Sequence, residues 1–414
     1  MARNRALLLA VVTAALFIAV APQNAGAQTA PTITAGSVDN NFPDGIVFHA
    51  SAAASETITD VRLRYEILPD GTSASAKPDF TPGASVEVEV VLDTYLPPGT
   101  IINYHWEVRA GDEVAESPEQ SFFYDDVRFQ WEKLEAGNLS VYYYTGDDSA
   151  AQALHDVGVQ VLSDAEALLD VQVPFPVNVW IYDSREDMAP ALQRTSPTYE
   201  SGVITLGVRV ASDTVLVLGD VSYDTLRHEL THVVTAVAGD SAFGSLPFWL
   251  DEGTAVRFQQ DKGGYKTAIE EAIESGDVLS VHEITTSPGE ADKVSLFYGQ
   301  SWSIVSFLID TYGQEKFAQV FAGIKSGELP DDALETVYGF DQDGLENAWR
   351  EANGLPARVT PEPTEAPQQT DAPSVRSDDD GGASTSTLIA IAVGVLALAA
   401  LVGFGGITLA RKVG

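Results

Sequence analysis

The sequence predicts an α+β chain of several domains, and three patterns along its length lead to this prediction. Residues 28–130 contain short runs in which apolar and polar side chains alternate, as in half-buried strands. Residues 131–355 mix strand-like runs with stretches whose apolar residues recur every three or four positions, as on helices. Near the C-terminus, Leu388–Ala410 is a run of 23 residues without a charged side chain.

The first 27 residues resemble a signal for export. Arg3 and Arg5 precede an apolar run from Ala6 to Val20, and Ala25-Gly26-Ala27 forms a small-residue cleavage site. We therefore expect residues 1–27 to be a signal peptide that is removed from the mature protein.

Residues 28–130 are predicted to form a separate β-sandwich of the immunoglobulin or fibronectin type. In one run Val61, Leu63 and Tyr65 alternate with charged residues, and in another Tyr104 and Trp106 alternate with polar ones. Turns rich in proline and glycine separate these runs. Such a module is more often a spacer or a recognition unit than a catalyst, and its fold alone assigns no activity.

Residues 131–355 carry the elements of a second domain. Three runs read as strands and the rest mainly as helices. The expected strands are 138–144, 177–182 and 214–218, and the expected helices are 149–169, about 222–238, one starting near 247, and 298–312.

The helix expected at 222–238 contains His228-Glu229-Leu230-Thr231-His232. On a helix, positions i and i+4 are about 40° apart, so His228 and His232 can bind one cation. Glu229 lies on the adjacent flank, where it can take a proton from a water molecule whose pKa the metal lowers. The motif is the spacing of zinc peptidases, and it predicts one Zn²⁺ ion as cofactor.

A catalytic zinc site needs three protein ligands, and the third is not settled by spacing. A further histidine six residues after His232 is absent, because Ala238 occupies that position. The chain contains no cysteine, so the downstream candidates are the carboxylates of Asp240, Asp251 and Glu252. The other histidines, which we expect to be structural or exposed, are His49, His105, His155 and His282.

The segment Trp249-Leu250-Asp251-Glu252-Gly253-Thr254-Ala255 resembles the W-L-x-E-G-x-A motif of gluzincin metallopeptidases of the peptidase MA-like group. The resemblance covers about residues 131–353 and implies a small mixed sheet followed by a helical half. It also implies that Glu252 is the third zinc ligand. In thermolysin-like members an acid four residues later orients a histidine, but here that position is Val256.

Two further expectations concern small and aromatic residues of this region. Gly253 should let its helix approach the helix that carries the histidines. Tyr298, expected at the start of a helix, is a candidate donor to the oxyanion that forms when water attacks a peptide carbonyl, as tyrosines are in related gluzincins. The alternative for Tyr298 is a buried aromatic residue of the core.

The C-terminal region predicts a membrane anchor. Residues 356–386 are rich in proline and acidic residues and are expected to form a disordered stalk. Residues 387–410 are expected to form a transmembrane helix, since 23 residues span about 34 Å as a helix. Arg411 and Lys412 then place residues 411–414 in the cytoplasm and the preceding domains outside the cell.

Composition narrows the classes of function. The chain has 23 basic and 60 acidic residues, a formal charge of −37, so nucleic acid is not an expected partner. An exported chain without cysteine fits a bacterial surface better than a eukaryotic one. Two classes remain: a membrane-anchored extracellular zinc peptidase, endopeptidase or aminopeptidase, acting on peptides or proteins, and a catalytically inactive surface binding or adhesion protein with a relict metal site. No pattern indicates an oligomeric state.

Overall fold

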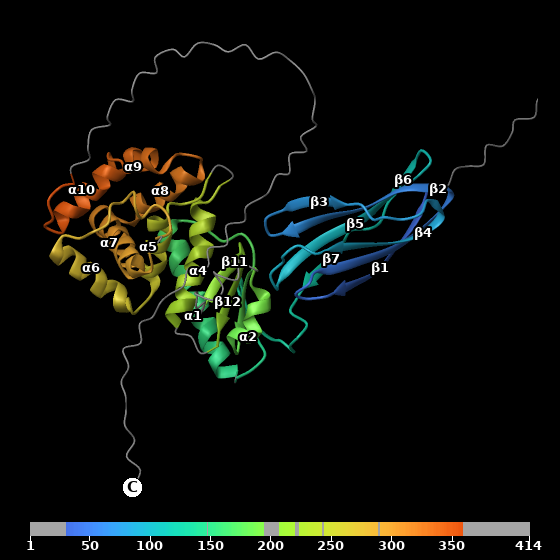
Figure 1. Ribbon diagram of the computed structural model, residues 1–414, viewed down its shortest axis with the longest axis horizontal. Helices are drawn as coiled ribbons and strands as arrows, with labels where there is room; N and C mark the ends of the chain where they lie inside the picture. Colours follow the sequence, from blue (N-terminus) through green and yellow to red (C-terminus); the bar gives the residue numbers. More distant parts are fainter. Residues whose placement is uncertain are drawn as a thin grey trace, which may run out of the picture.

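The computed structural model describes residues 30–146, 148–193, 207–219, 223–241, 244–288 and 290–358. In this part of the chain a β unit comes first, a mixed sheet follows, and a group of helices completes the fold (Figure 1). The β unit lies at one side of the molecule and the helices at the other, with the mixed sheet between them. This arrangement confirms a β-rich N-terminal region and a helical C-terminal half.

The β unit contains long antiparallel strands around one apolar core. Its strands are β1 (Thr32–Asn40), β2 (Ile46–Leu68), β3 (Thr72–Ala76), β4 (Gly83–Leu92), β5 (Thr100–Ala110), β6 (Glu113–Glu116) and β7 (Gln120–Tyr124). The first half of β2 pairs with β1 and β4, whereas its second half pairs with β3 and β5. Strand β2 therefore pairs with a different group of strands along each half, and the change occurs between Ala53 and Ile58.

The predicted alternation is seen in the pairing of β2 with β5. Val61 lies opposite Val108 and Leu63 opposite Trp106, and all four side chains are buried. The charged residues between them point outward, where Arg64 forms an ion pair with Glu107. The immunoglobulin or fibronectin type of this unit stays a prediction.

The mixed sheet contains β8 (Glu132–Ala136), β9 (Leu139–Tyr143), β10 (Val177–Tyr182), β11 (Gly207–Ala211) and β12 (Thr214–Leu218), in the order β11-β12-β10-β9-β8. The three central strands are parallel, and the edge strands β8 and β11 are antiparallel to their neighbours. The three strands expected in this region are confirmed. The two edge strands were not predicted.

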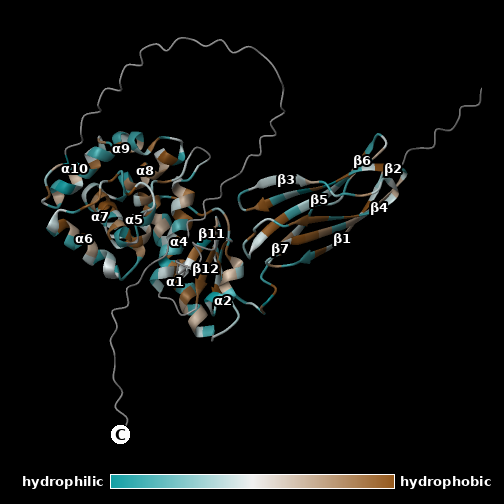
Figure 2. Ribbon diagram, viewed as in Figure 1, coloured by the Kyte–Doolittle hydropathy of each residue, from teal (hydrophilic) through white to brown (hydrophobic). Residues whose placement is uncertain are grey.

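Both faces of the mixed sheet are covered. On one face Val141, Val179 and Val217 pack with the helices, while on the other Trp180 and Leu216 join the core of the β unit. Burial on both faces explains why these strands are almost continuously apolar in sequence. Figure 2 shows hydrophobic residues in the strands of both sheets and many hydrophilic ones on the outer helices α9 and α10.

The helices are α1 (Asp148–Leu169), α2 (Arg185–Met188), α4 (Tyr223–Gly239), α5 (Phe248–Phe258), α6 (Gly263–Ser275), α7 (Val294–Tyr312), α8 (Gln314–Lys325), α9 (Pro330–Tyr338) and α10 (Gln342–Ala352), with short 3₁₀ turns η1 (Ala189–Ala191) and η2 (Ala291–Lys293). The predicted helices over α1, α4 and α5 are confirmed. The expected start of a helix at Tyr298 is wrong, because α7 begins at Val294 and Tyr298 lies in its second turn.

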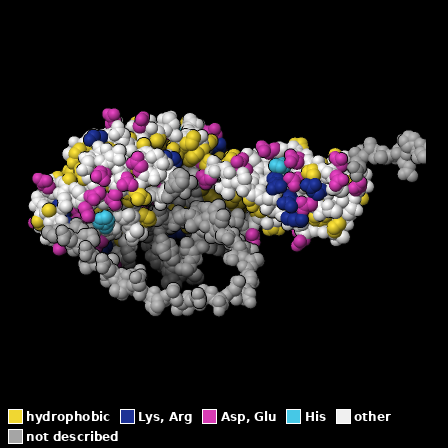
Figure 3. All heavy atoms as spheres, turned by 90° about the horizontal axis from the view of Figure 1, so that it is seen from above, with side chains coloured by type: hydrophobic (Ala, Val, Ile, Leu, Met, Phe, Trp, Pro, Cys, Tyr) yellow, Lys and Arg dark blue, Asp and Glu magenta, His cyan; other side chains and the backbone are white. Residues whose placement is uncertain are grey.

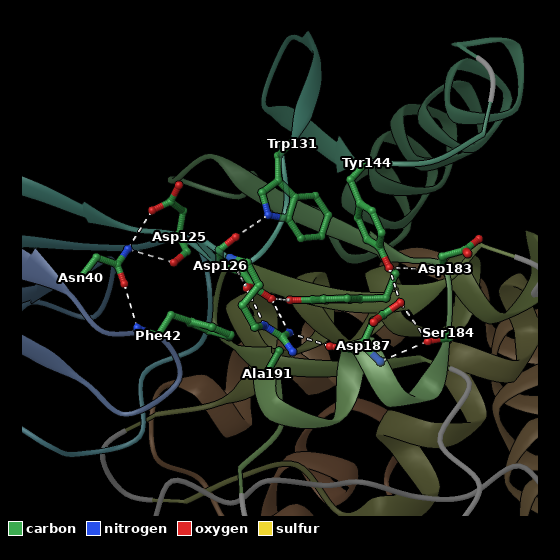
Figure 4. A network of polar contacts seen from close by, with 12 residues as sticks. Asn40, Phe42, Asp125, Asp126, Trp131, Tyr144, Asp183, Ser184, Asp187 and Ala191 are labelled. Carbon is green, nitrogen blue, oxygen red and sulfur yellow. Dashed lines mark hydrogen bonds and ion pairs between the residues drawn. The ribbon is translucent and has the colours of Figure 1, made fainter.

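A polar network joins the β unit to the mixed sheet (Figure 4). The carboxylate of Asp126 is fully buried and accepts hydrogen bonds from the Arg128 guanidinium, at 2.8 and 2.6 Å, and from the Tyr182 hydroxyl, at 2.9 Å. Arg128 also donates to the carbonyl oxygen of Asp187 at 2.6 Å. On the β unit's side, Asn40 donates to Asp125 at 2.8 Å. The chain segment that connects the two sheets therefore forms hydrogen bonds with both the β unit and the mixed sheet.

Several predicted segments lie outside the described residues. These are the signal peptide 1–27, the transmembrane helix 387–410, the tail 411–414, and the predicted stalk 356–386 beyond residue 358. Within the described residues no helix combines the length and apolar character that crossing a membrane requires. On the face shown in Figure 3, acidic side chains are spread over the helical half, and Lys and Arg side chains gather on the β unit.

Candidate metal centre

Helix α4 carries the histidines and is held in place by its apolar side. Leu226, Leu230, Val233 and Val234 are fully buried in the core that α4 shares with α1 and the mixed sheet. The opposite side of α4 presents His228 and His232 toward α5. The i, i+4 spacing therefore places both imidazoles on one side of the helix, as predicted.

Three donor atoms converge between α4 and α5. The Nε2 atoms of His228 and His232 are 3.2 Å apart, and the Glu252 Oε2 atom lies 3.2 Å from the first and 3.4 Å from the second. Ligands about 2.0–2.2 Å from a zinc ion at tetrahedral angles are separated by about 3.3–3.6 Å. The spacing of the three atoms therefore fits one small tetrahedral cation.

The burial of Glu252 supports the same interpretation. Its side chain belongs to a residue only 3% exposed, and its Oε2 atom forms no hydrogen bond among the described residues. Burial acts to raise the pKa of this carboxyl, but His232 and His228 outweigh it and lower the pKa to about 2. A buried carboxylate of this kind needs a positive charge beside it. Of the described residues, His228, His232 and Glu252 form a group with metal-binding geometry.

Asp251 has a different position from Glu252. Its Oδ1 atom lies 2.9 Å from Nδ1 of His232, on the ring edge away from Glu252, and accepts a hydrogen bond of 2.5 Å from Thr235. Burial acts to lower the pKa of His232, but Asp251 and Glu252 raise it well above its usual value. Asp251 thus orients a histidine, a function for which the sequence offered no residue. Asp240, the third carboxylate considered, is not part of the converging group.

Glu229 lies beside the centre and contacts the edge strand β11. Its Oε2 atom accepts a hydrogen bond of 3.1 Å from the backbone amide of Arg209. Strand and helix approach closely because Gly207 lacks a side chain: a Cβ atom there would lie 2.7 Å from Thr225 Cγ2 and 3.2 Å from Glu229 Cγ. Strand β11 was not predicted, so this partner of Glu229 could not be inferred from the motif.

Gly253 was expected to bring α5 close to the histidine-bearing helix α4, and this expectation is wrong. A Cβ atom at Gly253 would lie 2.3 Å from the carbonyl oxygen of Ser301, which belongs to α7 and not to the histidine-bearing α4. The glycine therefore brings α5 against α7. This contact matters for the site because Tyr298 lies one turn before Ser301 on α7.

Tyr298 reaches the centre from α7. The residue is 2% exposed, and the centroid of its ring lies 6.0 Å from that of His228. Burial, followed by the charge of Glu252, raises its pKa well above the usual value, so the phenol keeps its proton. The structure thus brings Tyr298 to the predicted ligands and also buries it in the core.

Tyr265 on α6 is a second phenol that sequence reasoning missed. Its ring stacks on Tyr298 with centroids 5.0 Å apart. Burial, followed by the charges of Glu252 and Glu229, raises its pKa to about 12. It lies outside both motifs, and no spacing rule marks it.

The remaining histidines lie away from the centre. His49 contacts Asp39 at 3.0 Å and His282 contacts Asp343 at 3.0 Å. His105 lies opposite Arg64 in the β unit, and His155 is buried on α1. None of them belongs to the converging group, as expected.

Comparison with known proteins agrees with this geometry. Residues 158–353 match the family model of the Peptidase MA superfamily. The match includes α4, α5 and α7, which carry the converging residues, and it supports a gluzincin-like metallopeptidase in general. No curated protein matches the chain.

Three solved structures illustrate the likeness, which is distant in each case. An M1 zinc metallopeptidase mutant from Deinococcus radiodurans, bound to a Tyr-Ser-Ala substrate, is 12% identical, with a TM-score of 0.34, and the match covers 81% of this chain and 96% of that one. The carbohydrate-binding module BhCBM56 is 14% identical, with a TM-score of 0.18, over 23% of this chain and 95% of the module. A family 64 β-1,3-glucanase from Paenibacillus barengoltzii is 15% identical, with a TM-score of 0.16, over 23% and 20%. No functional conclusion follows from likeness at these TM-scores.

Proposed function

We propose that the protein is a zinc-dependent peptidase in which His228, His232 and Glu252 bind one Zn²⁺ ion. The observation that carries the proposal is the convergence of three donor atoms within 3.4 Å of one another, one of them a buried carboxylate oxygen that has no hydrogen bond within the described part of the chain. A structural ion pair alone would not need two imidazoles and a carboxylate at the separations of a tetrahedral site. When bound, zinc polarises a substrate carbonyl and lowers the pKa of water to about 7.

Glu229 is the general base in this proposal. Its carboxylate is next to His228 on α4 and takes the proton of the attacking water, then gives it to the leaving amine. The hydrogen bond from the Arg209 amide holds the Glu229 carboxylate against β11. Among the described residues, the other carboxylate oxygen accepts no hydrogen bond, so it can take the proton of the water. Tyr298 keeps its proton and donates a hydrogen bond to the carbonyl oxygen as that atom becomes negative.

The substrate is a peptide or a protein segment in extended form. Among the described residues, strand β11 pairs only with β12 and lies at the edge of the mixed sheet next to Glu229. An extended peptide can add to such an edge as a further strand, which would carry its backbone past the centre. This supports hydrolysis of peptide bonds. Comparing the cleavage of substrates of different lengths would distinguish an endopeptidase from an aminopeptidase.

The proposed location is the outer face of a cell membrane. The support comes from the sequence: an export signal over 1–27, a proline-rich stalk over 356–386 and an apolar segment over 387–410 followed by Arg411 and Lys412. We further propose that residues 28–130 and 131–355 are separate domains, with the first one tethered to the second through the Asp126 network.

The test combines metal content with hydrolysis. The purified protein should contain one zinc ion per chain and should cleave members of an unbiased peptide library. Glu229→Gln should retain zinc and lose most of its activity, because an amide can still accept the Arg209 hydrogen bond but cannot take up a proton.

Two outcomes would contradict the proposal. Full turnover by a zinc-loaded Glu229→Gln variant would exclude the general base. Stoichiometric zinc in a wild-type protein that cleaves no peptide would instead favour the surface binding protein with a relict metal site.

A further inference from the structure

A cavity of about 610 Å³ lies between the β unit and the mixed sheet. The β unit lines it with the end of β2 and the turn that follows, Leu68–Asp70, and with the loop before β5, Thr94–Pro97. The mixed sheet lines it with Arg209–Asp213, the end of β11 and its turn into β12. The volume lies within the range of pockets that bind small ligands.

The cavity borders strand β11, which also contacts the candidate general base. Arg209 lines it, and the backbone amide of the same residue donates the hydrogen bond to Glu229. Asp240, which directly follows α4, also lines it. A peptide that runs along the free edge of β11 past Glu229 therefore meets this cavity a few residues from the bond to be cleaved.

The two walls of the cavity are fastened to each other. Ser212 on the β11–β12 turn donates a hydrogen bond of 2.6 Å to Oδ1 of Asp70 on the β unit. The Tyr95 hydroxyl, also from the β unit, donates to the carbonyl oxygen of Ala191 at 2.9 Å. These bonds, together with the Asp126 network, link the two units around the cavity.

The charges in the cavity are not balanced. Asp70 and Asp213 lie on either side of Ser212, and among the described residues neither forms an ion pair. Burial raises the pKa of Asp213 to about 6; hydrogen bonds from Thr214 and Asn178 oppose this rise, and the charge of Asp70 adds to it. The cation of the cavity, Arg209, acts on Asp240 instead, where it lowers a pKa that burial raises.

We infer that this cavity binds a basic side chain, lysine or arginine, of the peptide substrate. The aliphatic part of such a side chain fits against the apolar wall of Leu68, Pro69 and Leu96, and its charged end fits the Asp70–Asp213 pair. The inference rests on the proposed peptidase function and names a substrate class for it. It also gives the β unit a function, because this unit supplies Asp70 and the apolar wall.

The test uses the full chain and pairs of peptides that differ by one charge. Each pair carries either lysine or norleucine at one position, and the position is moved along the peptide. At one position the lysine peptide should be cleaved with a kcat/KM about tenfold higher than its norleucine partner, the effect of one favourable charge contact. Asp70→Asn should abolish most of this difference.

Matched variants separate the charge contact from a general effect on folding. Asp70 is exposed, so its replacement leaves the core intact, and Asp112→Asn, on an exposed turn of the β unit away from the cavity, should keep the full lysine preference. Asp213→Asn should reduce the preference as Asp70→Asn does. Equal kcat/KM values for the lysine and norleucine peptides at every position in the wild-type protein would overturn the inference.

Binding measurements keep the inference distinct from the peptidase proposal. Dissociation constants of the same labelled peptides are measured by fluorescence anisotropy on Glu229→Gln. Tighter binding of the lysine peptide, lost in Glu229→Gln combined with Asp70→Asn, supports the cavity even if the wild-type protein cleaves no peptide. Cleavage of both peptides with equal binding leaves the peptidase standing and rejects the basic-side-chain site.

Discussion

Asp251 and Glu252 are neighbours in the chain, but their carboxylates reach opposite sides of the His232 ring. Asp251 faces Nδ1 at 2.9 Å, and Glu252 faces Nε2 at 3.4 Å. The hydrogen bond at Nδ1 fixes the tautomer that leaves Nε2 free to bind a metal. In the proposed zinc site, the two neighbouring acids therefore have different functions, Glu252 as a ligand and Asp251 as an orienting group.

The different positions of Asp251 and Glu252 predict that their substitution weakens zinc binding to different extents. Glu252→Ala removes a ligand and should abolish tight binding, whereas Asp251→Asn removes only an orienting group and should weaken binding by about 10- to 100-fold. Competition with a chromophoric chelator measures both. Asp156→Asn, on the exposed side of α1, is the control and should bind zinc normally. Unchanged zinc affinity in Glu252→Ala, with loss only in the Asp251 variant, would make Asp251 the ligand.

Tyr298 can be tested against the tyrosine that stacks on it. Tyr298→Phe keeps the ring and its packing but removes the hydroxyl donor, so kcat should fall by about 10² to 10³ with zinc affinity and melting temperature unchanged. Tyr265→Phe removes the neighbouring phenol, whose ring is 5.0 Å away, and should have a smaller effect. A normal kcat in a folded, zinc-loaded Tyr298→Phe variant would leave Tyr298 with a packing function only.

At the scale of elements, the contact between α5 and α7 sets the position of Glu252 relative to Tyr298. Gly253→Ala should disrupt it, because the new Cβ would lie 2.3 Å from a backbone carbonyl oxygen that cannot move alone. Overpacking of this kind costs about 1–3 kcal/mol, which thermal denaturation would show as a lower melting temperature. Gly264→Ala on α6, where a Cβ meets nothing within 4 Å, should be neutral or stabilising. Equal stability of the two variants would show that the helices can separate at no cost.

The packing of the elements explains which parts of the site could be predicted from the sequence. The candidate ligands lie on α4 and α5, and local spacing and a short motif predicted them from the sequence. The Arg209 amide, Tyr265 and the orienting function of Asp251 depend on how β11, α6 and α5 pack against α4. That packing joins residues far apart in the chain, and no periodicity within one segment reports it. Strand β8 was missed because four of its five residues are exposed, so its sequence contains no apolar run.

At the scale of the whole molecule, the β unit lines one side of the cavity beside β11 and shares its core with the mixed sheet. Its core includes Trp180 and Leu216 of the mixed sheet, and the buried Asp126 carboxylate ties the connection to Tyr182. The β unit is therefore attached to the mixed sheet through both an apolar surface and charge-assisted hydrogen bonds. The sequence showed the alternating strands of this unit but not that its core continues into the next sheet.

Topology decides which substrates the whole protein can meet. An export signal ending at Ala27 and a span over 387–410 would leave the catalytic region outside the cell, with Arg411 and Lys412 inside. Protease added to intact cells should then release a large fragment and leave a small C-terminal piece in the membrane. A chain ending at Ser386 should appear in the medium, because it keeps the signal and lacks the apolar segment. A cytoplasmic marker protein must stay intact as the control. If the catalytic region is cleaved only after lysis, the orientation is reversed, and the substrates must be sought inside the cell.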